Sequence, residues 1–261
     1  MSDEQLDVFK PFLRTYIKVR TAEGRGEYDT KTLRALPNCP PSEPLAGQWR
    51  IRARSYSSLM DLLGKCLPPS AKVLDLGAGT GWLSNRLRAA GYRPCAVDIS
   101  NDSGDGLGRA QQFDSSWPCL QAEYDSLPIA DGSTDAVIFN ASFHYCTNRK
   151  QTITEALRVL SPGGLLIILD SPIYSDASSG EQMMLEQQVY FEQLIGERSD
   201  SLPATGYMTW EQLAEIASNF GLSWRFKRSW YGFRWAIRPW LAKLHGTREP
   251  ATFVIAWCRK Q

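Results

Sequence analysis

VLDLGAGTGWLS, residues 73–84, places three glycines within five positions directly after a run of apolar and β-branched residues. The run KVLDL predicts a strand, and WLSNRLRAAG predicts a helix that ends at Gly91. A glycine-rich turn between a strand and a helix brings bare backbone amides and the helix N-terminus against whatever lies above the sheet. Gly77, Gly79 and Gly81 therefore predict a small-molecule site.

The spacing of these glycines differs from that of a dinucleotide-binding turn. In the pattern G-x-G-x-x-G the third glycine would stand at Trp82, whereas here it comes one residue earlier, at Gly81. Asp75 ends the preceding strand, and its carboxylate would repel a pyrophosphate and attract an ammonium group. The residues thus predict a cationic or zwitterionic cofactor.

Downstream, short apolar runs alternate with amphipathic stretches, which indicates βαβ units and a parallel sheet covered on both faces. Strands are expected at 93–99, 119–124, 134–140 and 164–170, a helix at 149–160, and a closing antiparallel pair at 222–230 and 251–258.

The appended parts are expected to be helical. Helical spacing covers residues 5–20 and about 49–66, and a proline-rich linker lies between them. We interpret residues 1–69 as an N-terminal helical cap with this linker, and residues 70–261 as the main domain. Within that domain, residues 171–220 form a helical insertion after the fifth strand, which we expect to cover a substrate. Thr209 and Gln212 are spaced for a capping box in this insertion.

Four motifs in order, over about residues 70–171, resemble those of class I S-adenosylmethionine-dependent methyltransferases. VLDLGAGTGWLS resembles the family's motif I and AVDIS its second motif. AEYDSLPIADGSTDAVIFNASFHY and LRVLSPGGLLIILD are similar to segments of the type 11, ubiquinone/menaquinone-biosynthesis-like branch. The resemblance implies a Rossmann-like, doubly wound, mainly parallel seven-stranded sheet with an antiparallel last strand. It also implies S-adenosyl-L-methionine as the cofactor.

The resemblance assigns roles to single residues. Asp75 and the glycine turn would hold the methionine part, and Asn140 would lie beside it. Asp98 would bind the ribose hydroxyls, because one carboxylate can accept from both. Glu123 takes the adenine-binding acidic position, where the family usually has Asp. The predicted cofactor-binding residues are Asp75, Gly77, Ala78, Gly79, Gly81, Trp82, Asp98, Ile99, Glu123, Tyr124 and Asn140.

His144 follows the fourth strand and should lie at the carboxyl edge of the sheet. It is the candidate catalytic residue, either as a general base near neutral pH or as an imidazole that orients cofactor or backbone. No metal site is expected, since the six cysteines form no C-x-x-C pair and the chain has two histidines. Reduced, mostly buried thiols are expected instead.

We therefore expect methyl transfer to a small-molecule acceptor by in-line displacement. Two alternatives stay open: a methyltransferase acting on RNA, such as a tRNA base, and a catalytically silent cofactor-binding subunit. Residues 49–59 and 226–240 interleave cations with aromatic rings, which suits either stacking on a planar anion or RNA base, or packing at a sheet edge. The overall balance of 29 Lys and Arg against 28 Asp and Glu gives no bias towards nucleic acid.

The polar, acidic start MSDEQLDVFK does not resemble a secretory signal, and the dense apolar run GLLIIL is too short to span a bilayer. A cytoplasmic protein without membrane insertion is expected.

Overall fold

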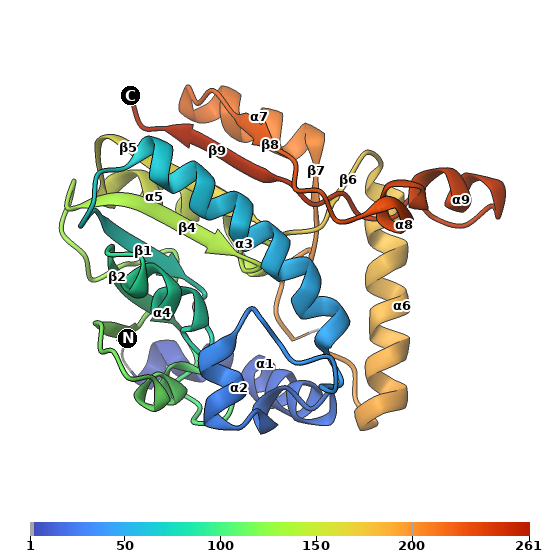
Figure 1. Cartoon of the computed structure of the whole chain (residues 1–261). Helices are drawn as coiled ribbons and strands as arrows, with labels where there is room; N and C mark the ends of the chain where they lie inside the picture. Colours follow the sequence, from blue (N-terminus) through green and yellow to red (C-terminus); the bar gives the residue numbers. More distant parts are fainter. Residues whose placement is uncertain (1–2, 200) are drawn as a thin grey trace.

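The computed structural model describes residues 3–199 and 201–261. A seven-stranded sheet with the order β3-β2-β1-β4-β5-β9-β8 forms the centre of these residues (Figure 1). Its strands are β1 (Lys72–Leu76), β2 (Arg93–Asp98), β3 (Cys119–Gln121), β4 (Thr134–Asn140), β5 (Leu160–Leu169), β8 (Arg225–Lys227) and β9 (Ile255–Arg259). The first five pair in parallel, and β9 runs antiparallel to both β5 and β8. The predicted fold class is confirmed.

Helices cover both faces of this sheet, as parallel strands require. Leu74 and Leu76 of β1 join one buried cluster, and Val73 joins the other, which is the alternation of a strand buried on two sides. The first cluster includes residues of α5 (Arg149–Val159) and α7 (Trp210–Phe220). The second includes residues of α3 (Ala46–Cys66) and α4 (Trp82–Ala89). The carboxyl ends of the strands are left for a site.

The N-terminal residues form α1 (Asp3–Ala22), the short helix η1 (Arg25–Glu27) and α2 (Thr30–Ala35). The predicted first helix is present, and it runs through Pro11. Tyr28, Leu33 and Leu36 are buried in the second core cluster, beside α3 and α4. This unit is therefore packed onto the sheet layer and is not separate from it.

Arg86 of α4 joins the N-terminal unit to the main domain. Its guanidinium donates to the carbonyl oxygens of Arg34, Ala35 and Leu36, at the C-terminal end of α2. These carbonyls have no partner within the helix, so a cation at this point satisfies them and complements the helix dipole.

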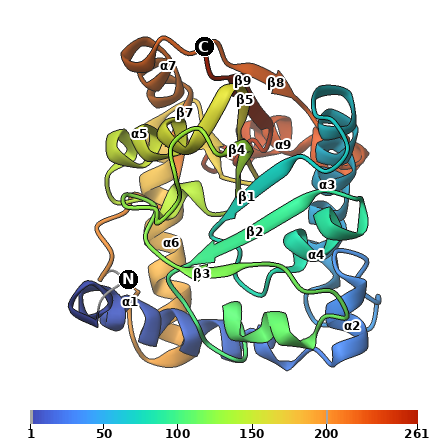
Figure 2. The same cartoon turned by 90° about the vertical axis from the view of Figure 1, so that its left-hand side faces the viewer.

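After β5 the chain forms β6 (Ile173–Tyr174), α6 (Ala177–Ile195) and β7 (Met208–Thr209), which pairs with β6. The predicted capping box of Thr209 and Gln212 is present at the start of α7. Helix α6 packs against α1, whereas Leu213 and Ile216 of α7 belong to the first core cluster. Figures 1 and 2 both show α6 standing beside the sheet rather than over its face.

Two local features differ from the expectations. The fifth strand was expected at residues 164–170, but β5 begins at Leu160 and contains Pro162, Gly163 and Gly164. The pairing there shifts from Thr134 with Leu160 to Ala136 with Leu165, which absorbs the irregularity as a bulge.

The second difference is a pair of short helices, α8 (Phe233–Ala236) and α9 (Arg238–Leu244), which project from the body beside α6 (Figure 1). Their few turns left no clear periodicity in the sequence. Among the described residues, every helix is too short or too polar to pass through a bilayer.

Candidate functional site

The turn after β1 depends on backbone conformations that favour glycine. Gly77, Gly79 and Gly81 have φ angles of +74°, +53° and +78°. At Gly77 a Cβ atom would overlap the side chains of Ser142 and Tyr124. The backbone amide of Gly77 donates to the Val97 carbonyl of β2 at 2.8 Å, which holds the turn against the neighbouring strand.

Gly81 has a different surrounding from the other two. It is the N-cap of α4, and a Cβ atom there would lie 3.1 Å from the Trp117 ring. It does not line the cavity described below. Gly81 therefore serves the turn and the packing of Trp117, and its contact with a cofactor stays a prediction.

A cavity of about 420 Å³ lies at the carboxyl ends of β1, β2 and β4. All the other predicted site residues line it: Asp75, Gly77, Ala78, Gly79, Trp82, Asp98, Ile99, Glu123, Tyr124, Asn140 and His144. They come from the ends of separate strands and from the turns that follow, so the fold collects at one place what the sequence separates by up to 69 positions, from Asp75 to His144.

Two buried carboxyl groups face this cavity. Burial, together with the charge of Asp98, raises the pKa of Asp75 to about 7, although Ser84 Oγ donates to its Oδ2 at 2.8 Å. Burial also raises the pKa of Asp98, whose oxygens accept from the amides of Gly79 and Ser100 at 2.8 Å each. Two carboxylates in a desolvated wall favour a cationic ligand, which would stabilise their charged forms.

Asn140 carries an unsatisfied acceptor. It ends β4 with 8% of its surface exposed, and its Oδ1 is buried without a hydrogen-bond partner. Ala141, the next residue and also in the cavity wall, has a φ of +54°, which is uncommon for a residue with a Cβ. A buried oxygen of this kind needs an N–H or O–H donor, and the cavity is where a ligand can supply one.

His144 lines the cavity, but its pKa is too low for an effective general base. Burial, together with the charges of Arg52 and Arg149, lowers its pKa to about 3. Its Nδ1 is 3.2 Å from Ser171 Oγ, so the ring has a fixed polar neighbour. A neutral imidazole that orients its surroundings agrees better with this environment than a general base does; the base role stays a prediction.

The cavity is covered by the two helical segments outside the sheet. Apolar side chains from α1, α6 and the chain after α6 line it: Phe9, Phe12, Leu13, Tyr16, Val19, Met183, Met184, Phe191 and Leu202. Helical spacing in the sequence showed that α1 has an apolar face, but not what this face covers.

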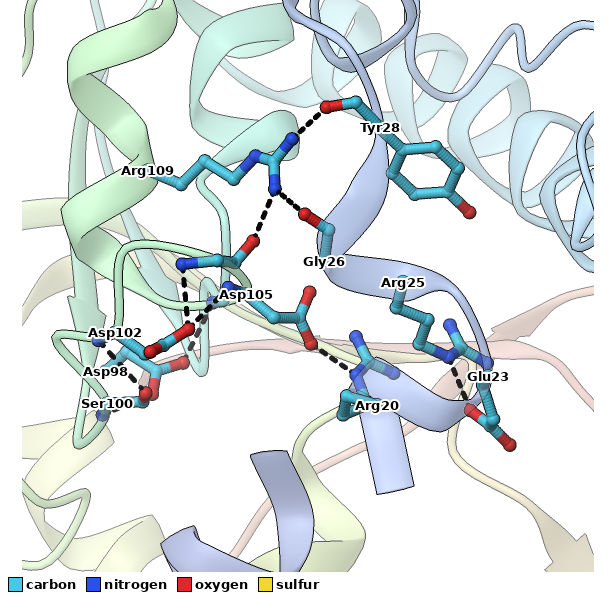
Figure 3. A network of polar contacts seen from close by, with 12 residues as sticks. Arg20, Glu23, Arg25, Gly26, Tyr28, Asp98, Ser100, Asp102, Asp105 and Arg109 are labelled. Carbon is cyan, nitrogen blue, oxygen red and sulfur yellow. Dashed lines mark hydrogen bonds and ion pairs between the residues drawn. The ribbon is translucent and has the colours of Figure 1, made fainter. Parts of the chain in front are cut away.

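A polar network joins the C-terminal end of α1 and the residues that follow it to the loop after Asp98 (Figure 3). Arg20 of α1 forms an ion pair with Asp105 of that loop. Arg109 donates to the carbonyls of Gly26 and Tyr28, and also to Gly104 at 2.7 Å. The loop that carries the predicted ribose ligand is thus held by the N-terminal unit.

Three arginines line the cavity and were not among the predicted site residues: Arg20, Arg25 and Arg52. Arg25 forms an ion pair with Glu23 at 2.7 Å and also donates to Gln48. In the sequence, the run WRIRARSY is the only signal for Arg52. It does not distinguish Arg52, which lines the cavity, from the neighbouring Arg50 and Arg54. Asp170, at the end of β5, is another wall residue that the motifs did not indicate.

The two cation–aromatic stretches meet each other. Arg54 donates to the Trp230 carbonyl at 2.9 Å, and Lys227 Nζ donates to the Ser58 carbonyl at 2.8 Å. These contacts support the packing interpretation for this part of the stretches. In residues 3–199 and 201–261, His, Cys, Asp and Glu side chains form no group of three or more that could hold a metal ion.

Comparison with known proteins agrees with this geometry. Residues 74–168 match the model of a family described as "Methyltransferase domain", of type 11. This part of the chain is similar to a methyltransferase domain. The matched residues run from β1 to β5 and include the glycine turn, Asp98 and Asn140.

Two curated relatives illustrate this similarity. A malonyl-[acyl-carrier protein] O-methyltransferase of Erwinia pyrifoliae is 30% identical over 141 residues, which are 51% of this chain and 53% of the relative. A sarcosine/dimethylglycine N-methyltransferase of Halorhodospira halochloris is 29% identical over 58% of this chain and 54% of the relative. The chain thus spans about half the length of the curated relatives it matches.

Solved structures share the fold of the methyltransferase domain. A methyltransferase in complex with the Trm112 activator of Haloferax volcanii superposes with a TM-score of 0.56, at 18% identity, over 82% of this chain and 96% of that one. A sarcosine dimethylglycine methyltransferase structure from Galdieria sulphuraria gives a TM-score of 0.54 at 18% identity, over 81% and 86%.

Proposed function

We propose that this chain binds S-adenosylmethionine at the carboxyl edge of its sheet and transfers the methyl group to a small molecule held under α1 and α6. One observation carries the proposal: one cavity of about 420 Å³ is lined by the glycine turn, by the carboxylates of Asp75 and Asp98, and by apolar side chains of α1 and α6. The curated relatives act on malonyl-[acyl-carrier protein] and on sarcosine or dimethylglycine, which favours a small acceptor group.

The chain's residues fit this cofactor. The bare backbone of Gly79 leaves room for close approach, and Asp98 would accept from the ribose hydroxyls. Asp75 and the unpaired Oδ1 of Asn140 are acceptors for the ammonium group. When bound, the cofactor would supply a methyl group already activated by the sulfonium charge.

The remaining work of the protein is positioning and exclusion of water. Residues of the proposed cap, 1–69, supply α1 and Arg52 to the cavity. Within the proposed insertion, 171–220, α6 and the chain after it supply covering side chains, whereas α7 packs on the sheet. His144, neutral at physiological pH, would orient the site through Ser171 rather than take a proton.

Calorimetry with S-adenosylhomocysteine tests the first half of the proposal, and binding is expected without added metal. The second half is tested by incubating the protein and cofactor carrying a labelled methyl group with a metabolite extract, with and without ribonuclease. Label in small molecules, unaffected by ribonuclease, is expected. Label confined to ribonuclease-sensitive material would make the protein an RNA methyltransferase. Cofactor binding with no transfer in any extract would indicate a silent subunit.

A further inference from the structure

The guanidinium of Arg52 differs from the other arginines of the cavity in having no charged contact. It stacks on the Trp49 ring at 5.3 Å from the ring centroid. In the part of the chain that the structure describes, it makes no hydrogen bond and no ion pair. Arg20 and Arg25, by contrast, are paired with Asp105 and Glu23. Arg52 is thus a cavity cation whose charge is not neutralised by direct contact.

Arg52 lies within electrostatic reach of Asp170 and His144 as well as of Arg25 and Arg20. Its charge lowers the pKa values of Asp170, which ends β5, and of His144. For Asp98, which is the predicted ribose ligand, the arginine whose charge lowers the pKa is Arg20. Asp170 does not pair with Arg52, because Ser55 Oγ donates to its carboxylate at 2.6 Å and burial raises its pKa.

An unpaired cation in such a place is costly. Burial and the like charges of Arg25 and Arg20 lower the pKa of Arg52, whereas the charge of Asp170 raises it, so on balance the charged form is disfavoured there. An anion delivered by a ligand would remove this cost. A carboxylate matches the planar guanidinium best, since it can accept two parallel hydrogen bonds. The same cavity is also lined by apolar side chains of α6, Met183, Met184 and Phe191.

We propose that Arg52 binds a carboxylate of the methyl acceptor, and that the acceptors of this enzyme are organic acids with an apolar body. The inference rests on the proposed function, with the cofactor on the side of Asp98 and the acceptor on the side of Asp170. The other source of a carboxylate in the cavity is the cofactor's own amino-acid end, and the experiment separates the two.

The test uses the full chain saturated with S-adenosylhomocysteine, and calorimetry with octanoate and the uncharged octanamide. Arg52→Met removes the charge and Arg52→Lys keeps it without the planar fork. Arg50→Met is the matched control, because Arg50 is exposed on the same helix and does not line the cavity. We expect wild type and Arg50→Met to bind octanoate with equal affinity. Arg52→Met should bind it at least tenfold more weakly, and the affinity of Arg52→Lys should lie between these values. Octanamide should bind all four proteins alike.

Equal affinity of octanoate for wild type and both Arg52 variants, or no preference of wild type for octanoate over octanamide, would overturn the proposal. A third comparison uses 5′-methylthioadenosine, which lacks the amino-acid part. If Arg52→Met weakens S-adenosylhomocysteine but not 5′-methylthioadenosine, Arg52 holds the cofactor's carboxylate and the acceptor assignment is wrong. Failure of wild type to bind S-adenosylhomocysteine would instead count against the proposed function. Circular dichroism confirms that each variant is folded.

Discussion

Tyr16 of α1 and Tyr145, which lies next to His144, meet edge to face with ring centroids 6.1 Å apart and ring planes at 89°. Phe12, one turn earlier on α1, also contacts Tyr145, at 6.0 Å. All three rings line the cavity. The N-terminal helix therefore contacts the residues after β4 directly, and we expect α1 or α6 to move when a ligand the size of S-adenosylmethionine enters or leaves the cavity.

This closure predicts an effect of the ion pairs between α1 and the end of α6. Lys18 and Arg14 both contact Glu197, and these side chains are partly exposed. Glu197→Lys replaces attraction by repulsion, and we expect S-adenosylhomocysteine to dissociate about twofold to fivefold faster, the scale of an exposed pair. Stopped-flow fluorescence measures the rate. Lys18→Glu combined with Glu197→Lys should restore most of the original rate, and no recovery would show that the pair does not govern opening.

The glycine turn predicts unequal costs for two alanine substitutions. Gly77→Ala combines a positive φ with overlap onto Ser142 and Tyr124, whereas Gly91→Ala has a φ of +89° and open space around its Cβ. We expect Gly91→Ala to destabilise by about 1 kcal/mol and Gly77→Ala by about 3 kcal/mol, with loss of S-adenosylhomocysteine binding. Urea unfolding and calorimetry check both values. Similar stabilities for the two variants would mean that the turn relaxes around the added methyl group.

Asp98 is predicted to bind the ribose through hydrogen bonds to a charged group. Asp98→Ala should weaken S-adenosylhomocysteine by about 1.5 to 3 kcal/mol. The same substitution should weaken 5′-methylthioadenosine comparably but have a smaller effect on its 2′-deoxy analogue, which lacks one of the two hydroxyl groups. Calorimetry with the three ligands gives the comparison. An equal loss for both nucleosides would place the ribose elsewhere.

Asp75 makes cofactor affinity depend on pH. Its pKa is about 7 in the free protein, and a bound ammonium group would lower it, so binding at pH 6 releases a proton. The affinity for S-adenosylhomocysteine should therefore rise at least about tenfold from pH 5 to pH 7. Calorimetry in buffers of different ionisation enthalpy detects the released proton. Asp75→Asn should bind more weakly at pH 7 and with little dependence on pH; an unchanged slope would assign the proton to another group.

The sheet and much of the cofactor wall could be predicted from the sequence, because their signals are local. Buried parallel strands are short apolar runs, and the carboxyl ends of such strands meet at one edge, so Asp75, Asp98 and Asn140 could be placed together from their positions alone. The turn at Gly77 could be predicted because three close glycines exceed what a plain turn needs.

The acceptor side could not be predicted in the same way, because it depends on contacts between distant segments. Arg50, Arg52 and Arg54 are equivalent in the sequence, yet one is exposed, one lines the cavity and one bonds to the Trp230 carbonyl. Their difference arises from the rotation of α3 on the sheet. The low pKa of His144 likewise depends on burial and on two arginines from other elements.

The guanidinium of Arg86, which covers three carbonyls at the end of α2, bears on the order in which the chain can fold during synthesis. Residues 30–36 leave the ribosome about fifty residues before Arg86, and their apolar partners Leu83 and Leu87 are also on α4. Residues 30–36 are therefore made before α4 but can reach their final packing only after β1 and α4 have emerged. Until then the carbonyls of Arg34, Ala35 and Leu36 lack the guanidinium of Arg86 as a donor.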